Sequence, residues 1–190
     1  MSMNRAVAAT LVVGAALLVP AAGIAALPKP KTATIKPLKS IDGVSLGMAK
    51  ARVVSQWGVP VYPNGDSACG ITSYDRGQTC VWFGRDAVPT LPPEGGVVHF
   101  NSAGKVCHVS IQAGVGLRPP NGLVITRLKG WKTTARIGLG SSIAAAKRAH
   151  GGQFLGGRGA TQFFFGAGTP PNQRKVVKIA LYRKPCRTSY

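Results

Sequence analysis

Few side chains in this sequence could do chemistry, and the most suggestive group lies in one short stretch. His99, Cys107 and His108 fall on the two arms of a predicted hairpin, where both imidazoles could face the same side of a sheet. With the thiol beside them, they offer the nitrogen and sulfur ligands that transition metals prefer. Two points oppose this hypothesis, because oxidation of Cys107 would remove the thiol and no fourth ligand is evident. We therefore expect no metal site.

The residue patterns of hydrolases are missing. Hydrolysis by paired carboxylates needs two acids about 5–10 Å apart, but the five acids of the chain are scattered in predicted loops before residue 95. No Gly-x-Ser-x-Gly turn presents a serine nucleophile. His150 ends a predicted helix in the second half of the chain, at the position where Trp57 ends a similar predicted helix in the first half. We therefore interpret His150 as a packing residue at the edge of the core. We expect no enzyme; the alternative is a hydrolase with an unfamiliar site at His99, His108 or His150.

The glycine-rich segments also lack a ligand-binding pattern. Residues 151–159 contain no Lys-Ser/Thr pair of a phosphate-binding loop, and no strand–Gly-x-Gly-x-x-Gly–helix unit exists. The turn at residues 138–142 precedes a helix, and its amides could hold an anion, although most such turns only cap the helix. The run Phe163–Phe165 is interpreted as a buried strand, with an exposed aromatic patch as the alternative. No cofactor is predicted.

Charge is the strongest compositional feature. The formal net charge is +19, and no carboxylate side chain occurs from Gly95 to Tyr190. Such a surface attracts polyanions, and outside the cell these are envelope polymers, lipid head groups or acidic proteins more readily than nucleic acid. The candidate anion-binding residues are Lys129, Lys132, Arg136, Lys147, Arg148, Arg174, Lys175 and Lys178. The alternative is that the charge reflects a generally basic proteome and has no function.

The N-terminal segment indicates export. Arg5 precedes the uncharged stretch Ala6–Leu27, and the small residues around Ala25 and Ala26 suit a signal peptidase. We expect residues 1–26 to be a signal peptide, with an uncleaved membrane anchor as the alternative.

The cysteines agree with export. Four cysteines without a Cys-x-x-Cys spacing fit two disulfides in an oxidising compartment. Of the three possible pairings we favour Cys69–Cys80, because these two residues bracket a short polar loop. Cys107 and Cys186 would then form the second bridge, unless both are buried free thiols.

A repeated phrase predicts which elements position these residues. Leu46-Gly47-Met48-Ala49 opens a short helix that ends at Trp57, and Leu139-Gly140-Ser141-Ser142 opens one that ends at His150. The stretch Lys105–Ile111 likewise returns as Lys175–Leu181. The helices are offset by 93 residues (Leu46 to Leu139) and the strands by 70 (Lys105 to Lys175). The sequence therefore predicts one supersecondary unit that is used twice.

The predicted fold class is α+β, with two tandem modules that each pack a short helix on antiparallel strands with a β-hairpin. A basic, proline-rich linker is expected at residues 27–40, the first module at 41–113 and the second at 114–190. The first module should hold a helix at 49–57, a strand at 80–83, and a hairpin of 97–100 with 106–111. The second should hold a strand at 123–128, a helix at 142–150 capped by Ser142, and strands at 162–165 and 176–182.

Alternation also predicts which side of the hairpin is buried. On the return strand, Cys107, Val109 and Ile111 alternate with His108 and Ser110. Because successive side chains of a strand point to opposite faces, we expect Cys107 to lie on the buried face with Val109 and Ile111.

The stretch from Gly47 to Pro60 resembles a known family. Gly47, Met48, Val53, Gly58 and Pro60 match the Gly-Met-Thr-x-x-x-Val-x-x-x-x-Gly-x-Pro pattern of the small-lipoprotein domain of the outer-membrane assembly machinery (SmpA/OmlA type), and Ala49 departs where Thr would cap. The tandem unit, with cysteines placed for a bridge after the first helix, also resembles the secreted β-lactamase inhibitory protein. The resemblance implies a scaffold for protein–protein contact without a catalytic set.

These observations predict an exported, non-catalytic protein that binds another protein in the cell envelope or outside the cell. The alternative is electrostatic binding of anionic envelope polymers or of a membrane surface through the basic second half. Neither specific nucleic-acid binding nor a membrane span after signal cleavage is expected. The sequence does not identify the partner.

Overall fold

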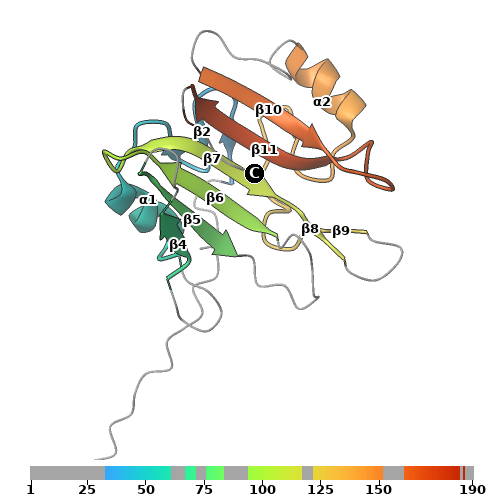
Figure 1. Cartoon of the computed structure of the whole chain (residues 1–190). Helices are drawn as coiled ribbons and strands as arrows, with labels where there is room; N and C mark the ends of the chain where they lie inside the picture. Colours follow the sequence, from blue (N-terminus) through green and yellow to red (C-terminus); the bar gives the residue numbers. More distant parts are fainter. Residues whose placement is uncertain are drawn as a thin grey trace, which may run out of the picture.

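Six antiparallel strands form one continuous sheet that carries most of the structure (Figure 1). The computed structural model describes residues 33–60, 67–71, 76–83, 94–116, 122–151, 161–184 and 186. The strand order is β10-β11-β7-β6-β5-β4. Their bounds are β4 Cys69–Ile71, β5 Gln78–Phe83, β6 Gly95–Phe100, β7 Val106–Gln112, β10 Thr161–Ala167 and β11 Val176–Arg183. The predicted signal peptide, residues 1–26, lies outside the described residues.

Smaller elements surround this sheet. A three-stranded sheet comprises β1 (Ile35–Lys36), β2 (Ser40–Ile41) and β3 (Val44–Ser45), and β8 (Gly114–Val115) pairs with β9 (Leu123–Val124). The helices are α1 (Lys50–Trp57) and α2 (Ile143–His150). Ile35 is fully buried although it lies in the predicted linker, so residues 33–40 are part of the folded structure.

The predicted fold class is wrong. The described chain is mostly β, with two eight-residue helices, and it does not divide into two helix-on-sheet modules. The strands of the two supposed modules instead pair with each other, since β11 lies antiparallel to β7. Each module alone would have left an edge strand with unpaired main-chain groups. Pairing β7 with β11 removes both edges and merges the strands into one sheet.

The repeat persists as a local motif. In each copy, the glycine before the helix donates its N–H to the carbonyl of the first residue of a strand. The N–H of that strand residue donates in turn to the carbonyl of the residue that follows the glycine. The bonds are Gly47 to Val106 (2.7 Å) and Val106 to Met48 (2.9 Å), then Gly140 to Val176 and Val176 to Ser141 (both 2.8 Å). Both glycines have positive φ, 82° and 79°, which glycine adopts without steric cost. The offsets of 93 and 70 residues are therefore confirmed at this motif.

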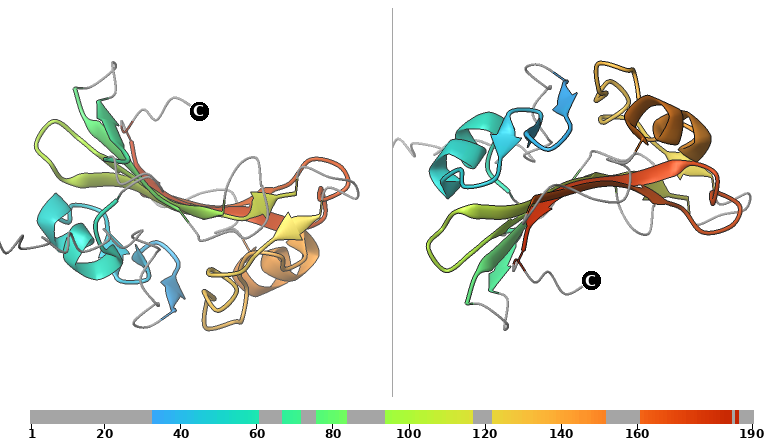
Figure 2. Two further views of the ribbon diagram at one scale, coloured as in Figure 1. Left: turned by 90° about the horizontal axis from the view of Figure 1, so that it is seen from below. Right: turned by 90° about the horizontal axis from the view of Figure 1, so that it is seen from above.

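Both helices lie on the same face of the six-stranded sheet (Figure 2). α1 buries Val53 and Trp57, and α2 buries Ala146. Trp57 meets Trp82 and Trp131 edge to face, with ring centroids 5.6 and 5.5 Å apart. The core therefore fills the layer between the helices and one sheet face, which leaves the second face to a different set of side chains.

The local predictions for the helices hold, whereas one strand is shorter than expected. The Ser142 hydroxyl accepts the Ala145 N–H at 3.1 Å, which confirms the predicted cap, and Ala49 makes no side-chain cap. The predicted strand at 123–128 is wrong beyond Val124, since β9 ends there.

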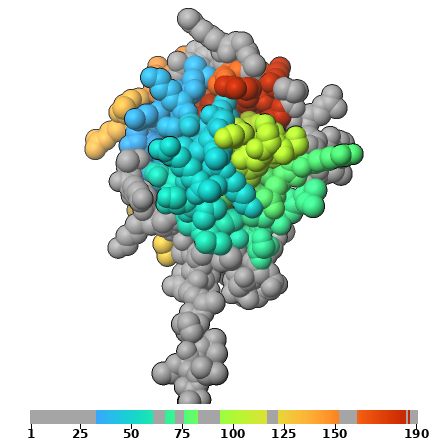
Figure 3. Space-filling view, turned by 90° about the vertical axis from the view of Figure 1, so that its left-hand side faces the viewer, coloured from blue at the N-terminus to red at the C-terminus, as the bar shows by residue number. Residues whose placement is uncertain are grey.

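On the surface, α1 lies beside the turn between β6 and β7 (Figure 3), where Ala49 bridges to Lys105.

Candidate functional site

A row of polar side chains crosses five strands on the sheet face opposite the helices. In register, Thr79 lies opposite His99, His99 opposite His108, His108 opposite Tyr182, and Tyr182 opposite Gln162. The Thr79 hydroxyl and His99 Nδ1 are 2.8 Å apart, and the Tyr182 hydroxyl donates to Gln162 Oε1. The His108 ring stacks on Tyr182 at 6.0 Å. The two histidines therefore share one side, as the sequence predicted.

The centre of this row is buried. His99 is 0% exposed and His108 is 3% exposed. Burial lowers the pKa of His108 from 6.5 to about 3, and the charges of Lys178 and His99 act in the same direction. His108 is consequently a neutral imidazole near neutral pH, and it cannot serve there as a general acid.

A β-bulge decides which side Cys107 takes. His99 pairs with His108 and Phe100 pairs with Val106, so Cys107 is the extra residue of β7. A bulge places two successive side chains on one side of the strand, and Cys107, although buried, is absent from the packed cluster that contains Val106, Val109 and Ile111. The expectation that Cys107 shares the buried face of Val109 and Ile111 is therefore wrong. Cys107 lies instead on the side of the histidines.

Both predicted disulfides are present. Cys69 bonds to Cys80 across the β4–β5 pair, and Cys107 bonds to Cys186, 79 residues further along the chain. Among the described cysteines none is free. The alternative of two free thiols is thereby excluded.

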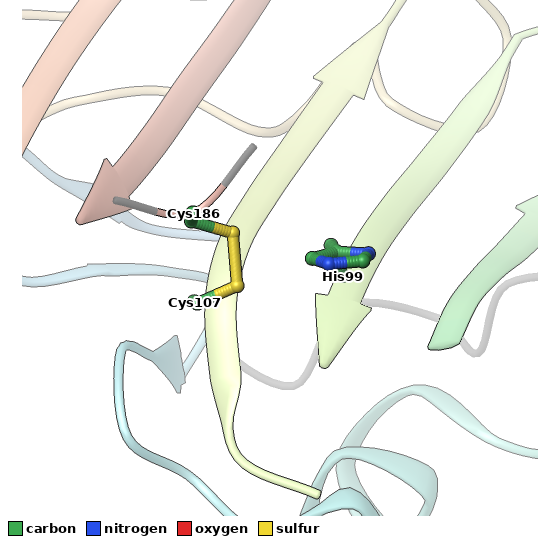
Figure 4. Close-up of side chains that lie close together, drawn as sticks. All are labelled: His99, Cys107 and Cys186. Carbon is green, nitrogen blue, oxygen red and sulfur yellow. A yellow bond between two sulfur atoms is a disulfide. The ribbon is translucent and has the colours of Figure 1, made fainter. Parts of the chain in front are cut away.

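The second disulfide lies beside His99 (Figure 4). One ligand atom each from His99, Cys107 and Cys186 fall within 4.8 Å of one another. One ring nitrogen of His99 is turned toward the two sulfurs and the other is turned away (Figure 4). The structure thus differs from the trio suggested by the sequence, because Cys186 takes the place of His108.

The two described carboxylates accept hydrogen bonds from backbone N–H groups. Glu94 is fully buried and accepts the N–H groups of Thr126, Arg127 and Leu128 at 2.7–3.3 Å, together with the Thr126 hydroxyl at 2.5 Å. Asp42 is 1% exposed and accepts the Ala33 N–H at 3.1 Å. By binding these amides, Glu94 takes the place of a sheet partner for residues 126–128, which explains why β9 ends early. Asp66, Asp75 and Asp86 lie outside the described residues.

The predicted anion-binding residues divide between two faces. Those on α2, in the segment before it and just before β11 are all exposed. They are Lys129, Lys132, Arg136, Lys147, Arg148, Arg174 and Lys175. Lys178 lies instead on the sheet face away from the helices, where it pairs in register with Gln112 of β7. Burial lowers the pKa of its amino group.

Three other predicted sites take structural roles. At the 138–142 turn, the amides of Gly138 and Gly140 donate within the chain, as do those of the following helix residues Ile143 and Ala145. The turn is therefore a cap. His150 stacks on Phe165 at 5.3 Å and lies 3.1 Å from the Thr133 hydroxyl, which confirms a packing role. Phe163 and Phe165 are buried in β10, as predicted for a core strand.

Sequence reasoning missed Thr79, Tyr182 and Cys186 as neighbours of the histidines. Alternation along β5 and β11 could have placed Thr79 and Tyr182 on one face, but only with the strand order known. Nothing in the spacing of Cys107 and His99 reveals the bulge.

Comparison with known proteins adds no further site, because no protein family, curated protein or solved structure matches the chain.

The resemblance to the SmpA/OmlA domain and to β-lactamase inhibitory protein stays a prediction. Within the described ranges no helix is long and apolar enough to cross a membrane. The two disulfides indicate that the chain folds in an oxidising, exported environment.

Proposed function

We propose that the protein is an exported, non-catalytic binding protein for a negatively charged macromolecule of the cell envelope or the extracellular space. One observation carries the proposal. The described surface exposes many lysines and arginines, while the only described carboxylates, Asp42 and Glu94, are 1% and 0% exposed. Nothing anionic on the described surface offsets these cations, so their field extends into solvent.

An anionic polymer is the favoured ligand. Exposed cations are spread over several elements, including Lys36 in β1, Arg52 in α1 and Lys105 in the β6–β7 turn, as well as the residues around α2. A specific protein contact needs a shaped patch with fixed partners, whereas a polymer with many phosphates or carboxylates responds to a diffuse field.

A protein partner is the second candidate, and a different surface favours it. Phe164 and Tyr182 pack edge to face at 6.0 Å on the sheet face away from the helices, and both are half-buried. Partly exposed aromatic pairs of this kind anchor many protein interfaces. The polar row beside them, with Gln162 at its margin, would supply the hydrogen bonds.

Binding to inorganic polyphosphate tests the first candidate. Two variants remove three charges each: R148Q/R174Q/K175Q on and next to α2, and K36Q/K39Q/R52Q in β1, in the turn between β1 and β2, and in α1 as the matched control. Because both sets lower the net charge equally, a diffuse field predicts similar losses of affinity in fluorescence anisotropy. The affinity of the unmodified protein should fall about 10-fold or more between about 0.05 and about 0.2 M salt.

The outcomes separate the candidates. A loss confined to the α2 set would replace the diffuse field by a defined anion site. Affinity that does not change with salt would contradict electrostatic binding. A pull-down from envelope and medium fractions that retains one protein at about 0.5 M salt would favour the sheet face, and variants of Phe164 and Tyr182 should then release it.

A further inference from the structure

We infer that His99, Cys107 and Cys186 form a copper(I) site that the disulfide closes and that reduction opens. Among the described residues, these three are the group of histidine, cysteine or carboxylate ligands whose donor atoms gather within 4.8 Å. The inference does not depend on the proposed function, since it concerns the sheet face away from most of the basic residues.

The donor atoms are close enough for one ion. A metal about 2.0–2.3 Å from an imidazole nitrogen and from thiolate sulfurs keeps its donors roughly 3.5–4 Å apart. The nitrogen of His99 already lies within 4.8 Å of both sulfurs. The two sulfurs are bonded to each other and separate on reduction; Cys107 lies in β7, and the Cys186 N–H donates to the Arg183 carbonyl at 2.8 Å. An ion bound by all three donors therefore requires the two sulfurs to move apart.

Thr79 orients the imidazole. Its hydroxyl lies 2.8 Å from Nδ1 of His99, and we assign the other ring nitrogen, Nε2, as the donor to the ion. When the hydroxyl accepts from Nδ1–H, Nε2 carries the lone pair that a metal needs. Metal-binding histidines are commonly held by such a hydrogen bond at the second nitrogen.

The ligand set and its surroundings select the ion. Two thiolates and one imidazole are soft donors, which favour copper(I) or zinc. Zinc in proteins takes four ligands as a rule, and the described residues supply three here. Copper(I) accepts three-coordinate geometry, so it fits this set without a further ligand. His99 is fully buried and Cys107 is 9% exposed, which limits the access of oxidants to the bound ion.

Opening the site takes two balanced steps. A dithiol donor transfers two electrons and two protons to the Cys107–Cys186 bond, which breaks to two thiols while the donor closes to its own disulfide. Copper(I) then binds both sulfurs and Nε2 of His99, and the two thiol protons pass to solvent. Cys186 is half-buried and Cys107 is 9% exposed, so we expect the donor to attack the sulfur of Cys186.

The experiment titrates copper(I) into the full chain under anaerobic conditions against a chromogenic copper(I) chelator, before and after reduction by a phosphine. The oxidised protein should not compete with the chelator. The reduced protein should bind one copper(I) more than the reduced C107A/C186A variant, which accounts for any ion held by Cys69 and Cys80. X-ray absorption should show two sulfurs and one nitrogen around this copper.

Matched variants assign the nitrogen. H99Q should weaken the site at least about 10-fold, and T79V about 10-fold through the lost hydrogen bond. H108Q, the neighbour on the same face, should bind as the unmodified protein does. If H99Q does not fold, the T79V affinity and the nitrogen signal of the unmodified protein carry the test.

Three results would overturn the inference. They are a reduced protein that binds no more copper than C107A/C186A, an affinity that H99Q and T79V leave unchanged, and a copper shell that contains sulfur alone. Reduction that unfolds the chain, if copper(I) does not restore its circular dichroism, would also overturn it.

Discussion

At the scale of single residues, two facing histidines take different positions on one sheet face. His99 lies 2.8 Å from the Thr79 hydroxyl and beside the Cys107–Cys186 disulfide, whereas His108 stacks on Tyr182. Burial first, and then the charges of Lys178 on β11 and His99 on β6, lower the pKa of His108 and so act against a positive charge on it. The fold thus keeps a cation off the centre of this face.

The lowered pKa of His108 predicts a stability that falls in acid. The unfolded chain binds a proton at this residue below about pH 6.5, but the folded chain does so only near its pKa of about 3. Stability is therefore fully present above pH 6.5 and is lost as the pH falls from there toward 3. With the disulfides intact, the free energy of unfolding should be about 2 kcal/mol lower at pH 5 than at pH 7, measured by denaturant titration.

The H108Q variant is the control for this effect. It removes the titrating group, so most of the difference between the two pH values should disappear. A smaller slope of the same sign should remain from His150, whose pKa is also lowered by burial. An undiminished slope in H108Q would show that other groups cause the acid sensitivity.

At the scale of elements, the contact between α1 and the sheet depends on a glycine. A Cβ added to Gly96 in β6 would lie 2.7 Å from the Trp57 ring, which is fully buried against Trp82 and Trp131. The ring cannot move without disturbing its two partners. Gly96 therefore fixes how closely α1 approaches the sheet.

Replacing this glycine should destabilise the protein. We expect Gly96→Ala to lower the free energy of unfolding by about 2–3 kcal/mol through overpacking, as measured by denaturant titration. Gly70→Ala in β4 is the matched control, because a Cβ there meets nothing within 4 Å, and its stability should change by less than about 1 kcal/mol. Equal effects of the two substitutions would refute the Trp57 contact as the cause.

Element boundaries also show how far the sequence could lead. Both helices, the hairpin turn and the Ser142 cap follow from local patterns, because apolar spacing, Asn101–Gly104 and a hydroxyl before a helix act over a few residues. Cys107 and residues 125–128 could not be predicted in this way. The first depends on a bulge in the pairing with β6, and the second on Glu94, which lies more than 30 residues away in the chain.

At the scale of the whole molecule, β7 and β11 come from the two copies of the repeat and pair with each other, so the chain does not divide into two modules. The repeat is present only as a local turn motif, and the sequence contains no sign that β7 would pair with β11. Register between distant strands depends on the complete set of edges and apolar faces, not on either strand alone. The proposed copper site shares this dependence, since Cys186 follows β11 and His99 lies in β6.

The two disulfides should contribute unequally to stability. They close loops of 11 and 79 residues, and the chain entropy that a closed loop removes from the unfolded state rises with its length. The chain-entropy relation predicts a loss of about 3 kcal/mol for C69A/C80A and about 4.5 kcal/mol for C107A/C186A. Denaturant titration of the two variants measures the difference, and a larger loss for C69A/C80A would contradict this account.

The position of β11 has a consequence for biogenesis. It is the last strand in chain order that the structure describes, yet it lies inside the sheet between β10 and β7. A chain that emerges from a translocation channel N-terminus first exposes β7 as a bare edge until β11 arrives. Resistance to proteolysis can thus develop only after β11 has emerged, which makes completion of the sheet a checkpoint that distinguishes molecules with all six strands from stalled ones.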